Sequence, residues 1–208
     1  MTPDLIDNRP QAANLRELRK LAEGCRACPL WRYATQAVCG EGPARARLML
    51  VGEQPGDQED LTGRPFVGPA GGVLDRALKD AKLPREKTYI TNALKHFKHV
   101  ARGKRRLHQR PNQSEIDACQ WWLAEELRLV APKLVIALGA TAARSLLGRS
   151  VTISRVRGTP MEAMGVEAFV TVHPSYILRV PDEPARKQVY EELVGDLVTA
   201  RTRLAALE

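Results

Sequence analysis

Residues 47–56 have the sequence Arg-Leu-Met-Leu-Val-Gly-Glu-Gln-Pro-Gly, and this stretch decides the fold that we expect. The run up to residue 51 is almost entirely apolar, which is typical of a strand buried on both faces of a sheet. The glycine and proline that follow predict an abrupt turn. Two polar side chains, Glu53 and Gln54, therefore come directly after the carboxyl end of a buried strand.

Further apolar runs predict three more strands of the same kind, at residues 88–92, 133–138 and 169–172. Helical patterns alternate with these strands, at residues 15–22 and 73–81, around Cys119, after Gly139 and at residues 184–204. Ser114 and Asp117 have the spacing of a capping box for the helix that carries Cys119. The alternation predicts an α/β fold: a three-layer sandwich with a central, mostly parallel four-stranded sheet flanked by helices.

Three polar turns follow the carboxyl ends of these predicted strands. They contain Glu53 with Gln54, then Asn92, then the run His173-Pro174-Ser175. In open α/β sheets this edge is where ligands bind, so we expect the three turns to form one pocket. The glycine-rich turn is neither a phosphate-binding loop nor a GxGxxG fingerprint, which disfavours a generic Rossmann-like nucleotide-binding domain.

Length and charge limit the class of protein. The 208 residues fit one domain, and Lys+Arg of 32 against Asp+Glu of 24 gives a net charge of +8. A basic domain favours a polyanionic partner, most commonly nucleic acid. No apolar run is long enough to cross a membrane. The segment Met1–Leu5 lacks the layout of a secretion signal, so we expect a cytoplasmic protein, and a monomer.

The four cysteines indicate a metal or redox site, because a disulfide framework is uncommon in the cytoplasm. Cys25 and Cys28 form a Cys-x-x-Cys pair, and Cys119 is a reasonable third ligand. The fourth ligand is either Cys39 or His96, and the softness of thiolate favours Cys39. An iron–sulfur cluster takes four cysteines or a mixed set with histidine, and a structural zinc ion is the main alternative.

Several motifs, in this order, resemble those of the iron–sulfur-containing uracil-DNA glycosylases: residues 52–57, 63–71, Thr91-Asn92, Ala137-Leu138-Gly139 and His173-Pro174-Ser175. Gln54 and the insert Lys104-Arg105-Arg106-Leu107-His108 resemble the UdgX-type branch, whose members bind uracil-containing DNA in an essentially irreversible complex. The resemblance implies a single domain over residues 1–208, with an N-terminal helix and cluster knuckle at about 11–40 and a basic insert loop at about 95–112.

The resemblance also implies a 4Fe-4S cluster. His96 stands where conventional relatives carry a cysteine, whereas Cys39 stands where they carry an apolar residue. The implied ligands are therefore Cys25, Cys28, His96 and Cys119.

The roles implied for the pocket follow the chemistry of a base taken out of the DNA stack. Phe66 stacks on the uracil, and the amide of Asn92 offers both a donor and an acceptor to its edge. Gln54 and Asp57 complete the uracil-binding residues. His173 donates a hydrogen bond to the departing base, a form of oxyanion stabilisation.

The basic insert carries the remaining implied roles. His108 is the nucleophile that captures the sugar, and Glu53 accepts a hydrogen bond from its ring. Phosphate contacts are implied for Lys104, Arg105, Arg106 and Arg110. The expected function is DNA repair by uracil excision with a covalent histidine–DNA adduct and a single turnover, on substrates that include single-stranded DNA. The alternatives are a conventional multiple-turnover glycosylase and a non-catalytic iron–sulfur DNA-binding module.

Overall fold

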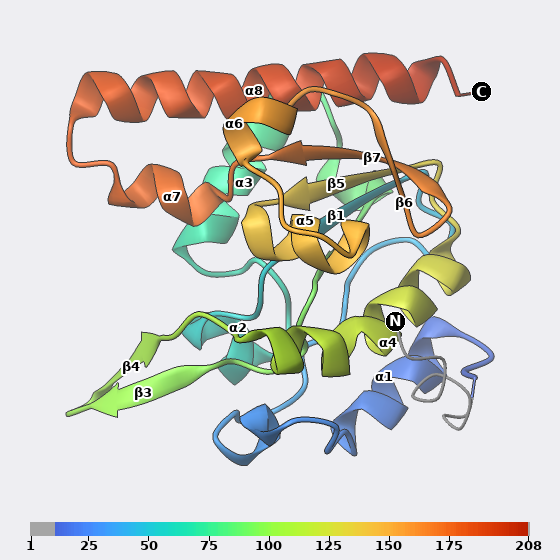
Figure 1. Cartoon of the computed structure of the whole chain (residues 1–208), viewed down its shortest axis with the longest axis vertical. Helices are drawn as coiled ribbons and strands as arrows, with labels where there is room; N and C mark the ends of the chain where they lie inside the picture. The colour runs from blue at the N-terminus through green and yellow to red at the C-terminus, as the bar shows by residue number, and fades with distance from the viewer. Residues whose placement is uncertain (1–10, 208) are drawn as a thin grey trace.

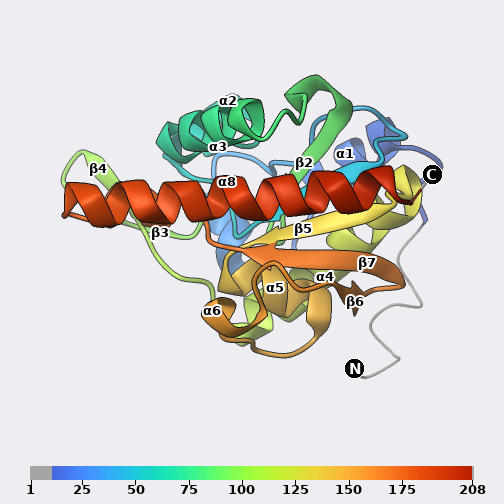
Figure 2. The ribbon, with the colours of Figure 1, turned by 90° about the horizontal axis from the view of Figure 1, so that it is seen from above.

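The computed structural model of the chain describes residues 11–207 and shows one sheet between two layers of helices (Figure 1, Figure 2). The strand order is β2-β1-β5-β7-β6, with all pairs parallel except β6 with β7. The bounds are β1 Leu48–Gly52, β2 Thr88–Asn92, β5 Leu134–Leu138, β6 Met161–Ala163 and β7 Val166–Thr171. The predicted α/β sandwich and its four parallel strands are confirmed, and β6 is an additional edge strand. The Met1–Leu5 segment lies outside the described residues.

Successive residues of each parallel strand enter two different hydrophobic cores. Met49 and Val51 of β1 pack on one side of the sheet, and Leu48 and Leu50 pack on the other. Burial on both faces explains why the strand sequences are continuously apolar. The helices on the first side are α1 Leu15–Glu23, α4 Gln113–Val130 and α5 Ala140–Leu147. Those on the second side are α3 Pro69–Asp80, α7 Pro174–Arg179 and α8 Glu183–Ala205.

Local backbone chemistry moves two helix starts away from the predicted positions. Helix α3 begins four residues before the expected position 73, at Pro69, because proline is well suited to the first helical turn. The capping box of α4 consists of Asn112 and Glu115, so the prediction of Ser114 with Asp117 is wrong. Asn112 Oδ1 accepts from the Glu115 amide at 3.0 Å, and Glu115 Oε2 accepts from the Asn112 amide at 2.7 Å.

Four short helical elements connect these larger ones: α2 Asp57–Thr62, α6 Ile153–Val156 and the 3-10 turns Pro29–Arg32 and Arg85–Lys87. Within residues 11–207 no helix has both the length and the apolar character needed to cross a bilayer.

The basic insert is a β-hairpin rather than the irregular loop expected at 95–112. Strands β3 His99–Arg102 and β4 Arg105–His108 pair antiparallel, with His99 opposite His108. Gly103 occupies the turn with φ +59°, a conformation that glycine adopts readily. The hairpin projects from the body at the lower left of Figure 1, and it carries His108 at its base.

A buried ion pair joins the end of β2 to α4. Lys95 and Glu126 are each 1% exposed, and Lys95 Nζ lies 2.7 Å from Glu126 Oε2. Glu126 also accepts hydrogen bonds from Thr91 Oγ1 and the Gly40 amide, at 2.7 and 2.8 Å. Lys95 Nζ donates to the Asn92 carbonyl at 2.7 Å. The pair therefore fixes the backbone at the carboxyl end of β2.

Replacing Lys95 with Met should lower the free energy of unfolding by about 3–5 kcal/mol, because Glu126 would keep a buried charge without its counter-ion. Adding Glu126→Gln should recover part of this loss, since the amide removes the uncompensated charge, its oxygen still accepts from the Gly40 amide, and its NH2 group can donate to Thr91 Oγ1. Denaturant unfolding of the two variants tests this. A Lys95→Met protein that unfolds at the wild-type denaturant concentration would show that the pair does not stabilise the fold.

Candidate active site

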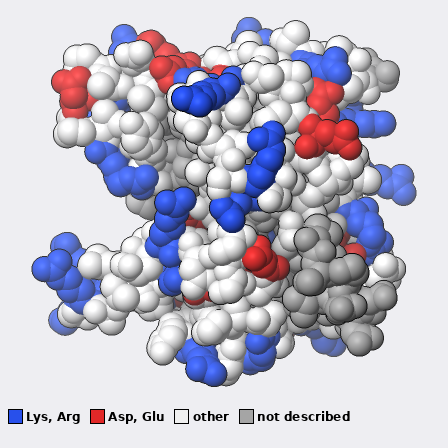
Figure 3. Space-filling model, viewed as in Figure 1, with Lys and Arg blue, Asp and Glu red and all other residues white. Residues whose placement is uncertain are grey.

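A cavity of about 960 Å³ opens at the carboxyl edge of the sheet. Its lining includes Glu53 and Gln54 after β1, Asn92 at the end of β2, Thr141 after β5 and His173 after β7. The predicted convergence of the three polar turns is thus confirmed. Figure 3 shows the surface hollowed between α7 and the hairpin, with Lys and Arg side chains on both sides of the hollow.

One corner of the cavity is formed by Phe66 and Asn92, which are 5% and 2% exposed. Within residues 11–207 the buried Asn92 Oδ1 has no hydrogen-bond partner. A Cβ on Gly52 would lie 2.3 Å from Asn92 Oδ1 and 2.5 Å from Phe66 Cζ, so only glycine leaves room for both side chains. Because an unsatisfied buried oxygen is costly, this corner is suited to a ligand that donates a hydrogen bond.

The protonation of His173 follows from its contacts. Its Nδ1 accepts a hydrogen bond from the Ser175 amide at 3.1 Å and lies 2.8 Å from Ser175 Oγ. A backbone amide can only donate, so the proton of the neutral ring is on Nε2. Burial lowers the pKa of His173 to about 4, which keeps the ring neutral near pH 7. His173 therefore offers the cavity an uncharged N–H donor.

His108 lies at the cavity between a carboxylate and an amide. Its Nε2 is 3.1 Å from Glu53 Oε1 and 2.8 Å from Gln54 Nε2. The two contacts require opposite protonation of this nitrogen, because the carboxylate accepts a proton and the amide N–H donates one. The side chain of His108 is 52% exposed, whereas that of Glu53 is 23% exposed. The imidazole is therefore held by its neighbours and still open to a ligand.

Glu53 is suited to accept hydrogen bonds. Burial alone would raise its pKa, but hydrogen bonds with His108 and Thr141 and the nearby His173 bring the pKa below its ordinary value. The Thr141 hydroxyl donates to Glu53 Oε2, and Oε1 faces His108. Glu53 is thus a carboxylate with a separate partner for each oxygen.

The side chain of Gln54 joins the two ends of the hairpin segment. Its Oε1 accepts from the Lys98 amide at 3.0 Å, and its Nε2 donates to the Gln109 carbonyl at 2.9 Å. Gln54 is only 7% exposed. The predicted contact of this residue with uracil stays a prediction, and the observed contacts instead fix the base of the hairpin.

Arg106 and Asp57 contact each other, although we expected DNA and uracil as their respective partners. Arg106 Nε donates to Asp57 Oδ1 at 2.6 Å, and Arg106 Nη1 donates to the fully buried Asp60 at 2.5 Å. The guanidinium thereby ties β4 to α2. Lys104 and Arg105 are exposed, and Arg110 lines the cavity. The predicted contact of these three residues with phosphate stays a prediction.

The predicted cluster ligands lie in buried positions. Cys28 and Cys119 are 8% and 2% exposed, and Trp122 Nε1 donates to Cys25 Sγ at 3.2 Å. His96 is 3% exposed, and its Nδ1 has no hydrogen-bond partner in the described chain. A buried imidazole nitrogen without a hydrogen-bond partner fits a metal ligand, because one tautomer of the neutral ring gives this nitrogen a free lone pair.

Cys39 has different surroundings. Burial and, to a lesser extent, the nearby Glu126 raise the pKa of its thiol to about 12, so this cysteine keeps its proton. Among residues 11–207 no three side chains of the metal-binding types stand close enough together to hold a metal ion. The ligand set Cys25, Cys28, His96 and Cys119 therefore stays a prediction, and the orphaned nitrogen of His96 is the observation in its favour.

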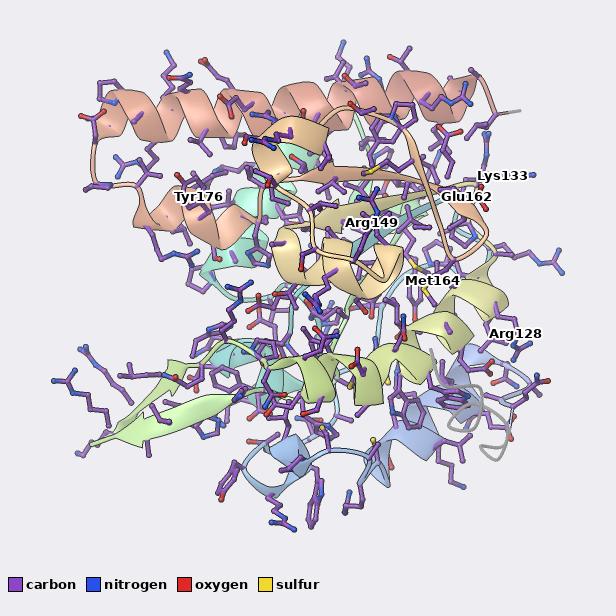
Figure 4. The ribbon with its side chains drawn as sticks, in the orientation of Figure 1. Arg128, Lys133, Arg149, Glu162, Met164 and Tyr176 are labelled. Atoms are coloured by element: carbon purple, nitrogen blue, oxygen red, sulfur yellow. The ribbon has the colours of Figure 1, made fainter. Side chains whose placement is uncertain are left out.

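Several residues that line the cavity were not predicted from the sequence. Thr141 is the second residue of α5, and its partner Glu53 is 88 positions earlier, so only the folded chain reveals their contact. Tyr176, which is 47% exposed, and Arg179 belong to α7. Figure 4 shows Tyr176 on the side of the molecule from which the hairpin projects. The sequence signal that could have identified Tyr176 and Arg179 is their position just after the His173-Pro174-Ser175 turn.

Comparison with known proteins agrees with this arrangement. Residues 39–198 match the uracil DNA glycosylase superfamily, and the chain belongs to that superfamily. It is 38% identical to a type-4 uracil-DNA glycosylase of Thermotoga maritima over 81% of this chain and 85% of the relative. It is 35% identical to a type-4 uracil-DNA glycosylase of Pyrobaculum aerophilum, over 81% of this chain and 86% of the relative. It is 30% identical to a type-5 uracil-DNA glycosylase of the same organism, over 81% of this chain and 78% of the relative.

Two adjacent glycines of α3 test how the Phe66 corner is held. A Cβ on Gly71 would lie 1.9 Å from the Phe66 carbonyl oxygen, whereas a Cβ on Gly72 would meet nothing within 4 Å. Gly71→Ala should therefore lower the free energy of unfolding by about 1–3 kcal/mol and shift the side-chain amide resonances of Asn92. Gly72→Ala should leave those resonances in place and raise stability by up to about 1 kcal/mol. Equal effects of the two variants would contradict the packing described here.

Proposed function

We propose that this protein excises uracil from DNA and then captures the exposed sugar carbon with His108. The observation that carries the proposal is the contact between His108 and Glu53 at the cavity that also contains Phe66, Asn92 and His173. Membership of the uracil-DNA glycosylase superfamily and the type-4 relatives supports the first step. The position of the His108 imidazole at the cavity supports the second step, capture of the sugar carbon.

Uracil binding follows from the groups that the cavity offers. The ring of Phe66 stacks on the extruded base. The orphaned Asn92 Oδ1 accepts the N3–H of uracil, while the amide nitrogen donates to the neighbouring carbonyl. Cytosine has a lone pair at N3, and that lone pair would face the Asn92 oxygen. The same geometry therefore rejects cytosine.

Bond cleavage leaves negative charge on the base. As the bond between C1′ and uracil N1 breaks, its electron pair moves onto the base, and the Nε2–H of His173 stabilises the developing anion. The neutral form of His173 suits this role because it donates without transferring its proton. Gln54 and Asp57, which also hold the hairpin and α2 beside the cavity, complete the uracil-binding residues.

The covalent step uses the lone pair of one imidazole nitrogen of His108. That nitrogen forms a bond to C1′, while the nitrogen turned toward Glu53 carries the ring proton. Loss of this proton balances the reaction, since the uracil anion takes up one proton and leaves as neutral uracil. The product is an N-alkyl imidazole. An imidazole anion is a poor leaving group, so the adduct persists and each molecule acts once in DNA repair.

DNA contacts outside the cavity are assigned to Lys104, Arg105 and Arg110, which set affinity without reading sequence. Single-stranded DNA presents its bases without the cost of opening a duplex, and it is a suitable substrate.

A 4Fe-4S cluster held by Cys25, Cys28, His96 and Cys119 completes the proposal. When bound, it fastens the segment after α1 to α4 and to the chain that follows β2. Cys39 and a structural zinc ion are the alternatives for the ligand set and the metal.

His108→Gly should abolish the adduct and leave uracil release intact, because water can then reach C1′. The measurement is a denaturing gel of protein boiled in detergent after incubation with uracil-containing single-stranded DNA, together with an assay of free uracil. His99→Gly is the matched control, since His99 lies opposite His108 in the hairpin. This control should form the adduct as the wild type does.

Two results would contradict the proposal in different ways. Free uracil without a detergent-resistant species from the wild type would indicate conventional multiple turnover. Binding of DNA without any release of uracil would indicate a non-catalytic module.

The cluster assignment predicts a difference between His96 and Cys39. Purified protein should be brown and contain about four iron and four sulfide ions per chain. His96→Ala should lose most of the iron, His96→Cys should retain it, and Cys39→Ala should match the wild type. Retention of iron in His96→Ala with loss in Cys39→Ala would assign the fourth ligand to Cys39, and zinc without sulfide would exclude the cluster.

A further inference from the structure

Thr141 contacts the active site through Glu53. Its hydroxyl donates a hydrogen bond to Glu53 Oε2, and its side chain is buried, at 3% exposure. The other oxygen of the same carboxylate, Oε1, lies 3.1 Å from His108 Nε2. The three side chains thus form a chain of contacts from the first turn of α5 to the hairpin.

The backbone around Thr141 gives the hydroxyl a fixed position. Gly139 precedes α5 with φ +90°, a conformation that favours glycine, and its amide donates to the Thr171 carbonyl of β7 at 2.9 Å. Ala142 and Ala143, the next two residues of α5, are fully buried in the core. The Thr141 hydroxyl is therefore attached to rigid structure, whereas His108 is on a projecting hairpin.

A carboxylate without such a partner can rotate about its terminal carbon–carbon bond. A hydrogen bond to one oxygen fixes this rotation and aims the second oxygen at the imidazole. The geometry points to Thr141 as a positioning residue for the covalent step: it orients Glu53 so that Glu53 in turn orients the ring of His108. This inference rests on the proposed function, because it concerns the step in which His108 bonds to C1′.

The role has a consequence for pH dependence. The groups around Glu53 that carry or can take charge come from several elements: His108 on the hairpin, His173 after β7, and Asp57, Glu59, Arg110 and Arg179 around the cavity. Thr141 lowers the pKa of Glu53 by donating to its ionised form. Removing the hydroxyl should raise that pKa, so the adduct-forming rate should begin to fall at a higher pH as the solution is acidified.

Thr141→Val and Thr141→Ser are a matched pair, because valine keeps the shape and serine keeps the hydroxyl. The rate of adduct formation is measured over a range of pH by quenching reactions with uracil-containing single-stranded DNA in detergent. Thr141→Val should be slower by about tenfold near pH 7, as expected for one hydrogen bond to a charged group. The pH at which its adduct-forming rate falls on acidification should be higher than in the wild type. Thr141→Ser should have the wild-type rate and pH profile.

A double-mutant comparison separates this role from a structural one. In a Glu53→Ala background, Thr141→Val should cause no further loss of adduct formation, since the carboxylate through which it acts is absent. Two outcomes would overturn the inference even if the wild-type protein forms the adduct. One is a double variant in which the rate losses of the two substitutions multiply. The other is a Thr141→Val protein with the wild-type rate and pH profile. A wild-type protein that forms no adduct would overturn the proposed covalent step, and the inference with it.

Discussion

Parallel pairing of β1 with its two neighbours is the constraint on which the site depends. Gly52 is in register with Asn92 of β2, and Leu138 of β5 is in register with Thr171 of β7. All four strands therefore end at the same edge, and the residues that follow them meet around one cavity. The cavity combines side chains from Glu53 to Arg179, 126 positions apart in the sequence, because the sheet brings their strands together.

The site consists of a rigid part and an exposed part. Phe66, Asn92 and His173 belong to the body of the protein and form the corner suited to a flat base. His108 instead belongs to the hairpin, and half of its side chain is exposed. Gln54 and Arg106 hold that hairpin through hydrogen bonds and ion pairs rather than through a hydrophobic core. This arrangement keeps the imidazole close to the cavity and leaves a path by which DNA can enter.

The features predictable from sequence were those set by local pattern. Continuous apolar runs identified β1, β2, β5 and β7, and the polar residues after them identified the cavity. The hairpin was not predicted, because each of its strands is only four residues long and lacks the apolar alternation of a half-buried strand. The start of α4 was misplaced by two residues because Asn112 and Ser114 are both good helix caps.

Contacts between distant segments could not be predicted from pattern at all. The expectation of DNA contact for Arg106 came from a run of basic residues, yet two carboxylates of α2 surround its guanidinium. Thr141 likewise has no signal in the sequence beyond its place in the first turn of a helix. Such pairings depend on the folded surface, and they determine which of several charged residues remain available to a ligand.

The central claim is that an imidazole beside Glu53 reacts with the sugar carbon that uracil leaves. Its most direct test is the intact mass of the protein after reaction with a uracil-containing oligonucleotide. We expect an intact mass equal to the sum of protein and oligonucleotide less one uracil, with no water added, and a modified peptide that contains His108. An unmodified protein beside an abasic oligonucleotide that has gained water, or a modified peptide from elsewhere in the chain, would contradict it.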